Sequence, residues 1–193
     1  MTAGEVILTT PRLTLRSWRE TDRDAFAAMH ADPEVMRDLG GPIDRTASDA
    51  KLDHYIAALR AHGFGRLAIE DSLGAFIGYA GVMQRDQGPP LGTHVEVGWR
   101  LARAAWGKGY VTEAAAAALR DVFDRTSLTE IISYTSADNV RSQAVMARLG
   151  LERDPARDFA LPNGWHGLVW VARLNSSQAW QAPRRSGDRA ASS

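Results

Sequence analysis

The sequence has no cysteine among its 193 residues, and its formal net charge is zero because 23 Lys and Arg balance 23 Asp and Glu. Without cysteine there is no disulfide framework, no cysteine-ligated zinc or iron–sulfur site, and no cysteine nucleophile. The neutral balance argues against broad electrostatic attraction to nucleic acid or to an anionic membrane. The remaining composition, 45% hydrophobic and 24% charged, is typical of an ordinary globular domain.

Signals for export or membrane insertion are also missing. The opening MTAGEVILTTPRL has no basic segment followed by an apolar one, so it does not resemble a signal peptide. No apolar run approaches the ~20 residues of a membrane span. We therefore expect a cytoplasmic protein with a single domain over residues 1–174. Residues 175–193 lose apolar periodicity and collect Ser, Arg, Gly and Pro, which predicts a disordered tail whose arginines are solvated and bind no nucleic acid.

Apolar spacing predicts the order of secondary structure within residues 1–174. That order is strand, two helices, three strands, helix, strand, helix, strand. It predicts an α/β fold with a mixed sheet, in which antiparallel hairpins come first and helical crossovers later. The expected segments are a strand over 12–18, a helix from about 21, a helix from about 46 to 63, strands over 64–70, 75–83 and 93–101, a helix over 106–123, a strand over 131–134, a helix over 139–149 and a strand over 168–174.

The stretch Trp106-Gly-Lys-Gly-Tyr-Val-Thr-Glu113 lies between a predicted strand and a long predicted helix. Glycines let the backbone approach a ligand closely, and the start of a helix directs free N–H groups and positive partial charge at it. Lys108 adds a full charge. The pattern is typical of a phosphate or pyrophosphate site, although a tight strand-to-helix turn accounts for the glycines equally well. It is neither a P-loop nor a dinucleotide-binding fingerprint.

The strand before this loop has two different faces. A polar strand face is costly when it is buried without partners, so this one is either solvated or lines a cleft. Glu96 is a natural general base if it lies in a cleft. His94 and Glu96 lack a third ligand at fixed spacing, so we expect no metal site. The apolar face carries Val95, Val97, Trp99 and Leu101, and the polar face carries His94, Glu96, Gly98 and Arg100.

A third feature is the segment NVRSQAVMARLGL, which begins at Asn139. Asn139 or Asp138 is a good helix N-cap, and Gly150 is a good residue to end the helix. Capping alone explains Asn139. Ser142 lies in the first turn, where a hydroxyl needs no functional explanation.

Together, these three pieces resemble the GNAT acetyltransferases, and more narrowly the branch that includes the ribosomal-protein N-terminal acetyltransferases. The residues that carry the resemblance are EVGWRL from Glu96, WGKGYVTEA from Trp106, and N-x-x-S with L-G-L at the end of the helix. The opening TPRLTLRSWRETD and the segment Asp32-Pro-Glu-Val are also typical of that branch. The resemblance spans about Val6 to Leu174 and implies a mostly antiparallel mixed sheet, splayed in the middle and flanked by helices.

The resemblance implies acetyl coenzyme A as the acyl donor and assigns residues to it. Its pantetheine arm would pair with backbone groups around Trp99 to Leu101 and with Asn139, and Ser142 would lie near the sulfur. The pyrophosphate would be held by Trp106, Gly107, Lys108, Gly109 and Tyr110, with Thr112 nearby.

Two positions depart from the pattern of the family. Ala104 stands where many members carry Gln or Arg, and Arg103 is one place away, so the phosphate clamp relies more on backbone and on Lys108. Met146 stands where many members place a tyrosine acid. The branch then implies Ser142 as the group that protonates the leaving thiolate, with Tyr134 as a weaker candidate.

The resemblance therefore implies an N-acetyltransferase that acts by direct attack of an amine while both substrates are bound, with Glu96 accepting the amine proton. The acceptor would be a protein or peptide N-terminus, or else a small amine. A silent acyl-coenzyme A-binding or interaction protein is the alternative, and a monomer and a homodimer are both open.

We expect the acceptor site to form from the two early helices, the Gly40-Gly41-Pro42 loop and residues 154–165. The acids of these segments would suit a cationic amine, although their arginines nearly offset them. The acids are Asp32, Glu34, Asp38, Asp44, Asp154 and Asp158, and the arginines are Arg37, Arg45, Arg153 and Arg157.

Overall fold

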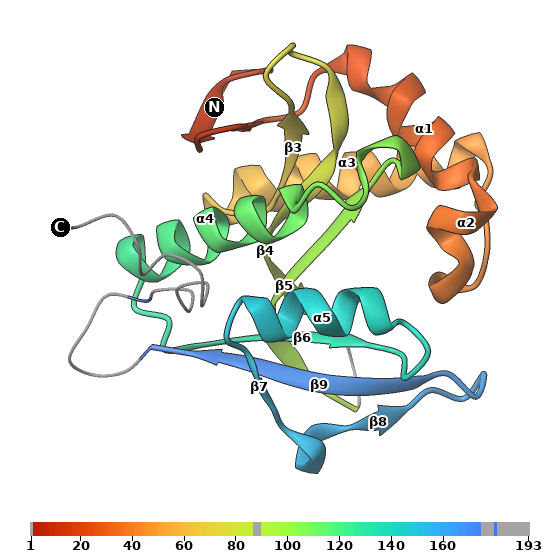
Figure 1. Ribbon diagram of the computed structural model, residues 1–193, viewed down its shortest axis with the longest axis vertical. Helices are drawn as coiled ribbons and strands as arrows, with labels where there is room; N and C mark the ends of the chain where they lie inside the picture. The colour runs from red at the N-terminus through yellow and green to blue at the C-terminus, as the bar shows by residue number, and fades with distance from the viewer. Residues whose placement is uncertain (1, 87–89, 175–179, 181–193) are drawn as a thin grey trace, which may run out of the picture.

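One mixed sheet carries the fold in the computed structural model, which describes residues 2–86, 90–174 and 180 (Figure 1). Its strands follow the order β1-β2-β3-β4-β5-β6-β9-β7, and β8 pairs with β9. Neighbouring strands are antiparallel except β5 and β6. The strands are β1 (Val6–Thr9), β2 (Thr14–Arg16), β3 (Arg66–Glu70), β4 (Phe76–Asp86), β5 (Thr93–Leu101), β6 (Glu130–Thr135), β7 (Glu152–Arg153), β8 (Phe159–Ala160) and β9 (His166–Arg173).

Helices cover this sheet where the sequence predicts them, with one addition. The expected α/β fold with a splayed, mostly antiparallel sheet is confirmed. The additional helix starts at Pro33, in a segment for which the apolar spacing predicts no helix. Proline is favoured in the first turn of a helix, and Asp32 caps this one by accepting from the Glu34 N–H at 2.8 Å. The helices are α1 (Arg23–Ala31), α2 (Pro33–Met36), α3 (Arg45–His62), α4 (Tyr110–Arg125) and α5 (Val140–Arg148).

Three short strands, β1, β7 and β8, were not predicted from the sequence. Each has two to four residues, too few to show a period of two. The segment predicted as a strand over 12–18 is shorter in the structure, because Thr10 to Leu13 form the turn between β1 and β2.

The sheet splays between β5 and β6, and this opening positions the site. The two strands are in register only at Glu96 and Ile132. The Ala102 N–H donates to the Ile77 carbonyl on β4, so by alternation the backbone groups of Trp99 and Leu101 point toward the opening. Figure 1 shows α4 lying across β4 and β5, and α5 along β6.

A large apolar core holds α4 against the sheet. Ala115, Leu119 and Val122 of the helix are buried at 2% exposure or less and pack with Val97 on the apolar face of β5. The apolar side of α4 and the predicted apolar face of β5 therefore pack against each other. Trp180, the one residue of 175–193 that the structure describes, is also buried here, with its ring centroid 6.1 Å from that of Phe123. The predicted disorder of that segment otherwise lies outside the described residues.

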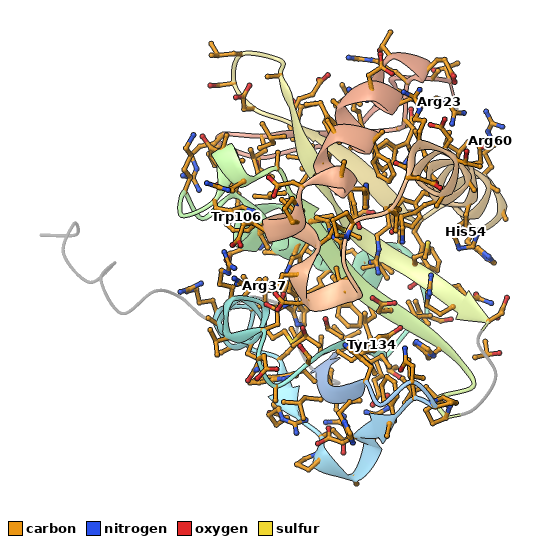
Figure 2. The ribbon with its side chains drawn as sticks, turned by 90° about the vertical axis from the view of Figure 1, so that its right-hand side faces the viewer. Arg23, Arg37, His54, Arg60, Trp106 and Tyr134 are labelled. Atoms are coloured by element: carbon orange, nitrogen blue, oxygen red, sulfur yellow. The ribbon has the colours of Figure 1, made fainter. Side chains whose placement is uncertain are left out.

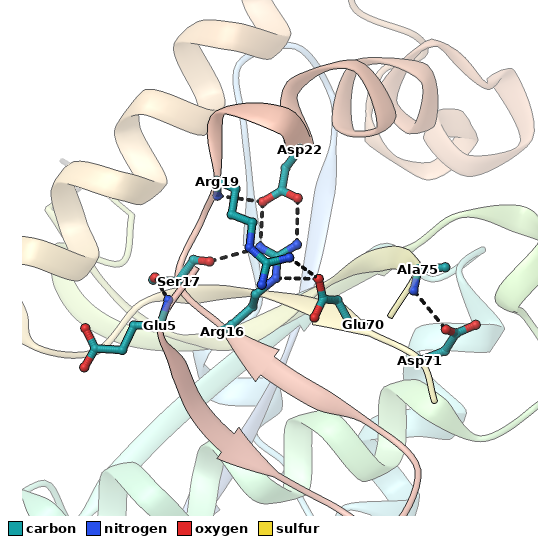
Figure 3. Close-up of polar contacts among 8 residues, drawn as sticks. All are labelled: Glu5, Arg16, Ser17, Arg19, Asp22, Glu70, Asp71 and Ala75. Carbon is teal, nitrogen blue, oxygen red and sulfur yellow. Dashed lines mark hydrogen bonds and ion pairs between the residues drawn. The ribbon is translucent and has the colours of Figure 1, made fainter. Parts of the chain in front are cut away.

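A buried ion cluster joins β2, β3 and the start of α1 (Figure 3). The Arg16 guanidinium is 1% exposed and donates to both carboxylate oxygens of Asp22 at 2.7 Å and to Glu70 Oε1 at 2.7 Å. Burial alone would lower the pKa of Arg16, but these two carboxylates raise it above its ordinary value. The cluster fixes the helical layer onto the sheet away from the opening.

Candidate active site

A cleft with a volume of about 1960 Å³ runs through the opening in the sheet. Every residue that the sequence assigned to catalysis or to the donor lines it. His94 does not line this cleft, although it belongs to the polar face of β5, and its Nδ1 lies 2.9 Å from the Gly92 carbonyl oxygen. The residues brought together are Glu96, Trp99, Leu101, Trp106, Gly107, Lys108, Gly109, Tyr110, Thr112, Asn139 and Ser142.

The loop before α4 has the geometry of an anion site. Gly107 and Gly109 have φ values of 76° and 77°, which glycine adopts without strain. Gly109 is the N-cap of α4 and gives it no side-chain cap, so first-turn N–H groups stay available to a ligand. Lys108 is exposed beside them. This arrangement fits a pyrophosphate.

A clamp from the β1–β2 turn holds this loop, and the sequence did not reveal it. Glu113 in the first turn of α4 accepts from Thr10 Oγ1 at 2.7 Å and pairs with the Arg12 guanidinium at 2.6 Å. Arg12 also donates to the Lys108 carbonyl at 2.8 Å. Burial alone would raise the pKa of Glu113, but these partners hold it below its ordinary value. These contacts join residues about a hundred positions apart in the sequence, so no local sequence pattern predicts them.

Further cations line the cleft on this side. The guanidinium of Arg141 lies 4.2 Å from the centroid of the Trp106 ring, a cation–π contact next to the glycines. Arg103, which is one place away from the usual phosphate-clamp position, does not line the cleft. The positive charge near the loop therefore comes from Lys108, Arg12 and Arg141.

Glu96 lies in the cleft, which resolves the two interpretations of the polar face of β5. Its carboxylate accepts from Arg66 Nη2 at 2.8 Å and from the Tyr134 hydroxyl at 3.2 Å, and Arg85 Nε lies 3.5 Å away. Arg66 also donates to the Gly81 carbonyl, and its side chain is 5% exposed. The sequence did not predict these partners, because Arg66 and Glu96 are 30 residues apart.

Tyr134 belongs to the same network. Burial, followed by the nearby Glu96 carboxylate, raises the pKa of its phenol well above the ordinary range. The hydroxyl therefore stays protonated at neutral pH and donates a hydrogen bond to Glu96. Tyr134 thus positions the carboxylate.

Asn139 caps α5, as its sequence position predicts. Its Oδ1 accepts from the Ser142 N–H at 3.0 Å. Ser142 is half-buried in the first turn, and Met146 is 1% exposed. The cap leaves the Asn139 side-chain amide as a donor at the cleft edge. The helix start and Ser142 thus face the same opening as Glu96.

The acceptor side of the cleft, where we expect the amine to bind, differs from expectation in its charge. The expected segments do border the cleft through Asp38 to Gly40 and through Phe159 to Trp165. Of the six acids expected there, however, only Asp38 lines it, and none of the four expected arginines does. Asp32 and Asp44 cap helices, and Asp154 and Asp158 pair with Arg157 and Arg153. The acids and arginines expected to set a slight bias toward a cationic amine therefore lie, apart from Asp38, outside the cleft lining.

The cations that line this side come from the middle of the chain. They are Lys51, Arg66, Arg85 and Arg100. No turn or helix signal distinguishes them in the sequence. Figure 2 looks at this side of the molecule and shows α2 and Arg37 between Trp106 and Tyr134 in that view.

Within the described ranges 2–86, 90–174 and 180, no three His, Asp or Glu side chains are grouped so as to hold a metal ion. No helix in that part of the chain is long and apolar enough to cross a membrane. A splayed sheet, a helix start that fits a pyrophosphate and a cleft through the opening are the features of a coenzyme A-dependent acetyltransferase.

Comparison with known proteins agrees. The family model described as an acetyltransferase (GNAT) domain matches residues 12–152. The chain therefore belongs to the GNAT family of acetyltransferases, which use acetyl coenzyme A.

Two known proteins are similar to this chain in sequence. The FsC-acetyl coenzyme A-N(2)-transacetylase of Aspergillus fumigatus is 31% identical over 151 residues, which cover 75% of this chain and 64% of that protein. An acetyltransferase from Agrobacterium tumefaciens has a solved structure with 33% identity and a TM-score of 0.74, covering 86% of this chain and 94% of that one. This chain thus spans just under two thirds of the length of the fungal relative.

The fold is also shared with a protein solved in complex with a form of coenzyme A. Mycobacterium smegmatis RimJ, solved in complex with a coenzyme A disulfide, has a TM-score of 0.66 and 19% identity, covering 83% of this chain and 81% of that one. At this identity the likeness shows the fold alone.

Proposed function

We infer that this protein moves the acetyl group of acetyl coenzyme A onto a primary amine, by direct attack while both substrates are bound. The observation that supports this most is the single cleft through the splayed sheet. It joins the loop at the start of α4 to Glu96 and Ser142 without an intervening wall. Two substrates that enter from opposite sides would meet at the opening. Positioning of this kind supplies much of the rate in reactions between two bound substrates.

Glu96 receives the proton that the attacking amine loses. As the amine nitrogen bonds to the thioester carbonyl carbon, the nitrogen becomes positive and must release a proton. The Glu96 carboxylate, held by Arg66 and Tyr134, accepts it through a water molecule. General base help of this kind contributes roughly 10²–10⁴-fold.

Ser142 assists the leaving group. When the carbon–sulfur bond breaks, the sulfur leaves with the electron pair and needs a proton. The Ser142 hydroxyl donates a hydrogen bond to it or protonates it, at a helix start whose positive partial charge also stabilises an anion. The Asn139 cap keeps the first turn of α5 in place for this role.

The test is thiol release from acetyl coenzyme A with a panel of peptide N-termini and small amines. We expect Glu96→Gln to lower kcat at neutral pH by at least 10-fold and to leave acetyl coenzyme A binding nearly unchanged. Thr93→Ala, an exposed change on the same strand, is the control and keeps the wild-type kcat. Wild-type kcat for Glu96→Gln across the pH range would remove Glu96 from this role. Binding of acetyl coenzyme A without turnover on any amine would instead support the silent interpretation.

A further inference from the structure

The acceptor side of the cleft carries a surplus of positive charge that the structure does not neutralise. Two carboxylates face four cations there. Glu96 is shared by Arg66 and Arg85, and Asp38 lies 3.9 Å from Arg37 outside the cleft lining. The cations are Lys51, Arg66, Arg85 and Arg100, and the carboxylates are Asp38 and Glu96.

Two of these cations have no acidic partner in the part of the chain that the structure describes. Arg100 donates to the Met36 thioether sulfur at 2.7 Å and lies 6.0 Å from the Tyr79 ring centroid. Lys51 is half-buried, and its ammonium lies 5.9 Å from the centroid of the Tyr55 ring. A neutral sulfur and an aromatic face are poor substitutes for a carboxylate.

These two cations act on their neighbours. Burial raises the pKa of Tyr79, but Arg100, Lys51, the Tyr55 hydrogen bond and Arg66 together hold it below its ordinary value. Burial, followed by the nearby arginines, lowers the pKa of Lys51. The Tyr55 hydroxyl donates to the Tyr79 hydroxyl at 3.3 Å, and both residues line the cleft together with these cations. The lowered pKa of Tyr79 is the effect that a surplus of positive charge has on a neighbouring acidic group.

We propose that Lys51 and Arg100 bind an anionic group, a carboxylate, on the acceptor molecule, so that this acetyltransferase selects amines that also carry negative charge. The proposal rests on the proposed function and specifies its acceptor. Lys51 on α3 and Arg100 on β5 both line the cleft, and Arg100 lies on the same face of β5 as Glu96. A cationic wall also favours the neutral, nucleophilic form of the amine over the ammonium form.

Matched acceptors test the proposal. Alanyl-glutamate amide and alanyl-glutamine amide share the attacking amine and differ only in the side-chain carboxylate. Glycine and glycinamide, each compared at an equal concentration of neutral amine, test a free α-carboxylate instead. We expect kcat/KM to be about 10- to 100-fold higher for the anionic member of at least one pair, the range for a hydrogen bond to a charged group. Equal values within both pairs would overturn the proposal.

Charge variants locate the preference. Lys51→Gln and Arg100→Gln should each remove most of it through KM, and Lys51→Arg should retain it. Lys51→Glu should turn it toward a cationic amine. Arg60→Gln is the matched control, because Arg60 lies on the same helix but on the outer edge of the molecule (Figure 2). A preference that survives in Lys51→Gln and in Arg100→Gln would overturn the assignment.

A binding measurement separates this inference from the proposed function. Calorimetric titration of the coenzyme A-loaded protein with N-acetyl-alanyl-glutamate amide and its glutamine counterpart needs no turnover. Tighter binding of the glutamate compound, lost in Lys51→Gln, supports the anion site even if no amine is acetylated. Equal binding of the two compounds contradicts it.

Discussion

Gly98→Ala is a sharp test of how the acceptor side is built, because it adds one methyl group at a known place. Gly98 lies on the polar face of β5, and its backbone has no left-handed conformation that would penalise alanine. A Cβ atom there would lie 2.5 Å from Arg66 Nη2 and 2.9 Å from Glu96 Oε1. The first distance is roughly 1 Å inside ordinary contact. Either the Arg66–Glu96 pair must move, or the strand must.

The size of the effect follows from how firmly Arg66 is held. Its side chain is 5% exposed and bonded to the Gly81 carbonyl as well as to Glu96, so it cannot swing into water. We expect the free energy of unfolding to fall by about 1–3 kcal/mol, the usual cost of overpacking. If Glu96 shifts by about 1 Å, kcat falls by up to about 10²-fold.

Chemical denaturation and acetyl-transfer kinetics check both effects. Thr93→Ala on the same strand should leave both at wild-type values. The affinity for coenzyme A should stay close to wild type in Gly98→Ala, since the loop before α4 is untouched. Wild-type stability together with wild-type kcat would refute the claim that the Arg66–Glu96 pair is rigid and matters to the reaction.

Three further predictions concern other parts of the molecule. Lys108→Ala should weaken acetyl coenzyme A binding by about 5- to 30-fold, as expected for one lost charged contact, whereas Lys108→Arg should not weaken it. Equal dissociation constants for wild type and Lys108→Ala, measured by calorimetry, would exclude Lys108 from phosphate binding. Arg16→Met should lower the free energy of unfolding by about 3–5 kcal/mol, because Asp22 would keep a buried charge without a cation and Glu70 would keep only the half-exposed Arg19. A loss below about 1 kcal/mol in urea would contradict this. His30 is fully buried, and burial lowers its pKa to about 4 from 6.5. The contribution of neutral His30 to the free energy of unfolding is therefore complete above pH 6.5 and is lost as the pH falls toward 4, by roughly 3 kcal/mol in all. Unfolding curves between pH 4 and 7.5 measure this, with the exposed His62→Gln variant as control; a flat profile for wild type would contradict it.

Much of the donor side could be predicted from the sequence, because its signals are local. Two glycines and a lysine before a long helix indicate an anion site whatever the rest of the fold does. The cap at Asn139 and the two faces of β5 follow from spacings of two to four residues. The structure places the glycine loop, Asn139 and the β5 residues from Glu96 onward, except Val97, on one cleft. The short strands and α2 escaped prediction because so few residues show no periodicity.

The acceptor side could not be predicted in the same way. The acids near α2 and in residues 154–165 predicted a slight preference for cations, yet most of them cap helices or pair with arginines. Lys51 lies in the middle of α3, where a lysine usually faces water. Whether a side chain faces water or a cleft depends on which element packs beside it, and single-sequence patterns do not contain that information.

The sequence by itself determined what is local: the motifs of the family, a glycine loop with the features of an anion site, the helix caps, and the exclusion of a cysteine acyl-enzyme. Only the tertiary structure decided the charge that meets the acceptor. Arg66 reaches Glu96 across 30 residues, and Arg12 reaches Glu113 across about a hundred. Such pairs form because the sheet order brings distant strands together. Electrostatic energy depends on separation in space and on burial, and the order of residues along the chain specifies neither until the strands are paired.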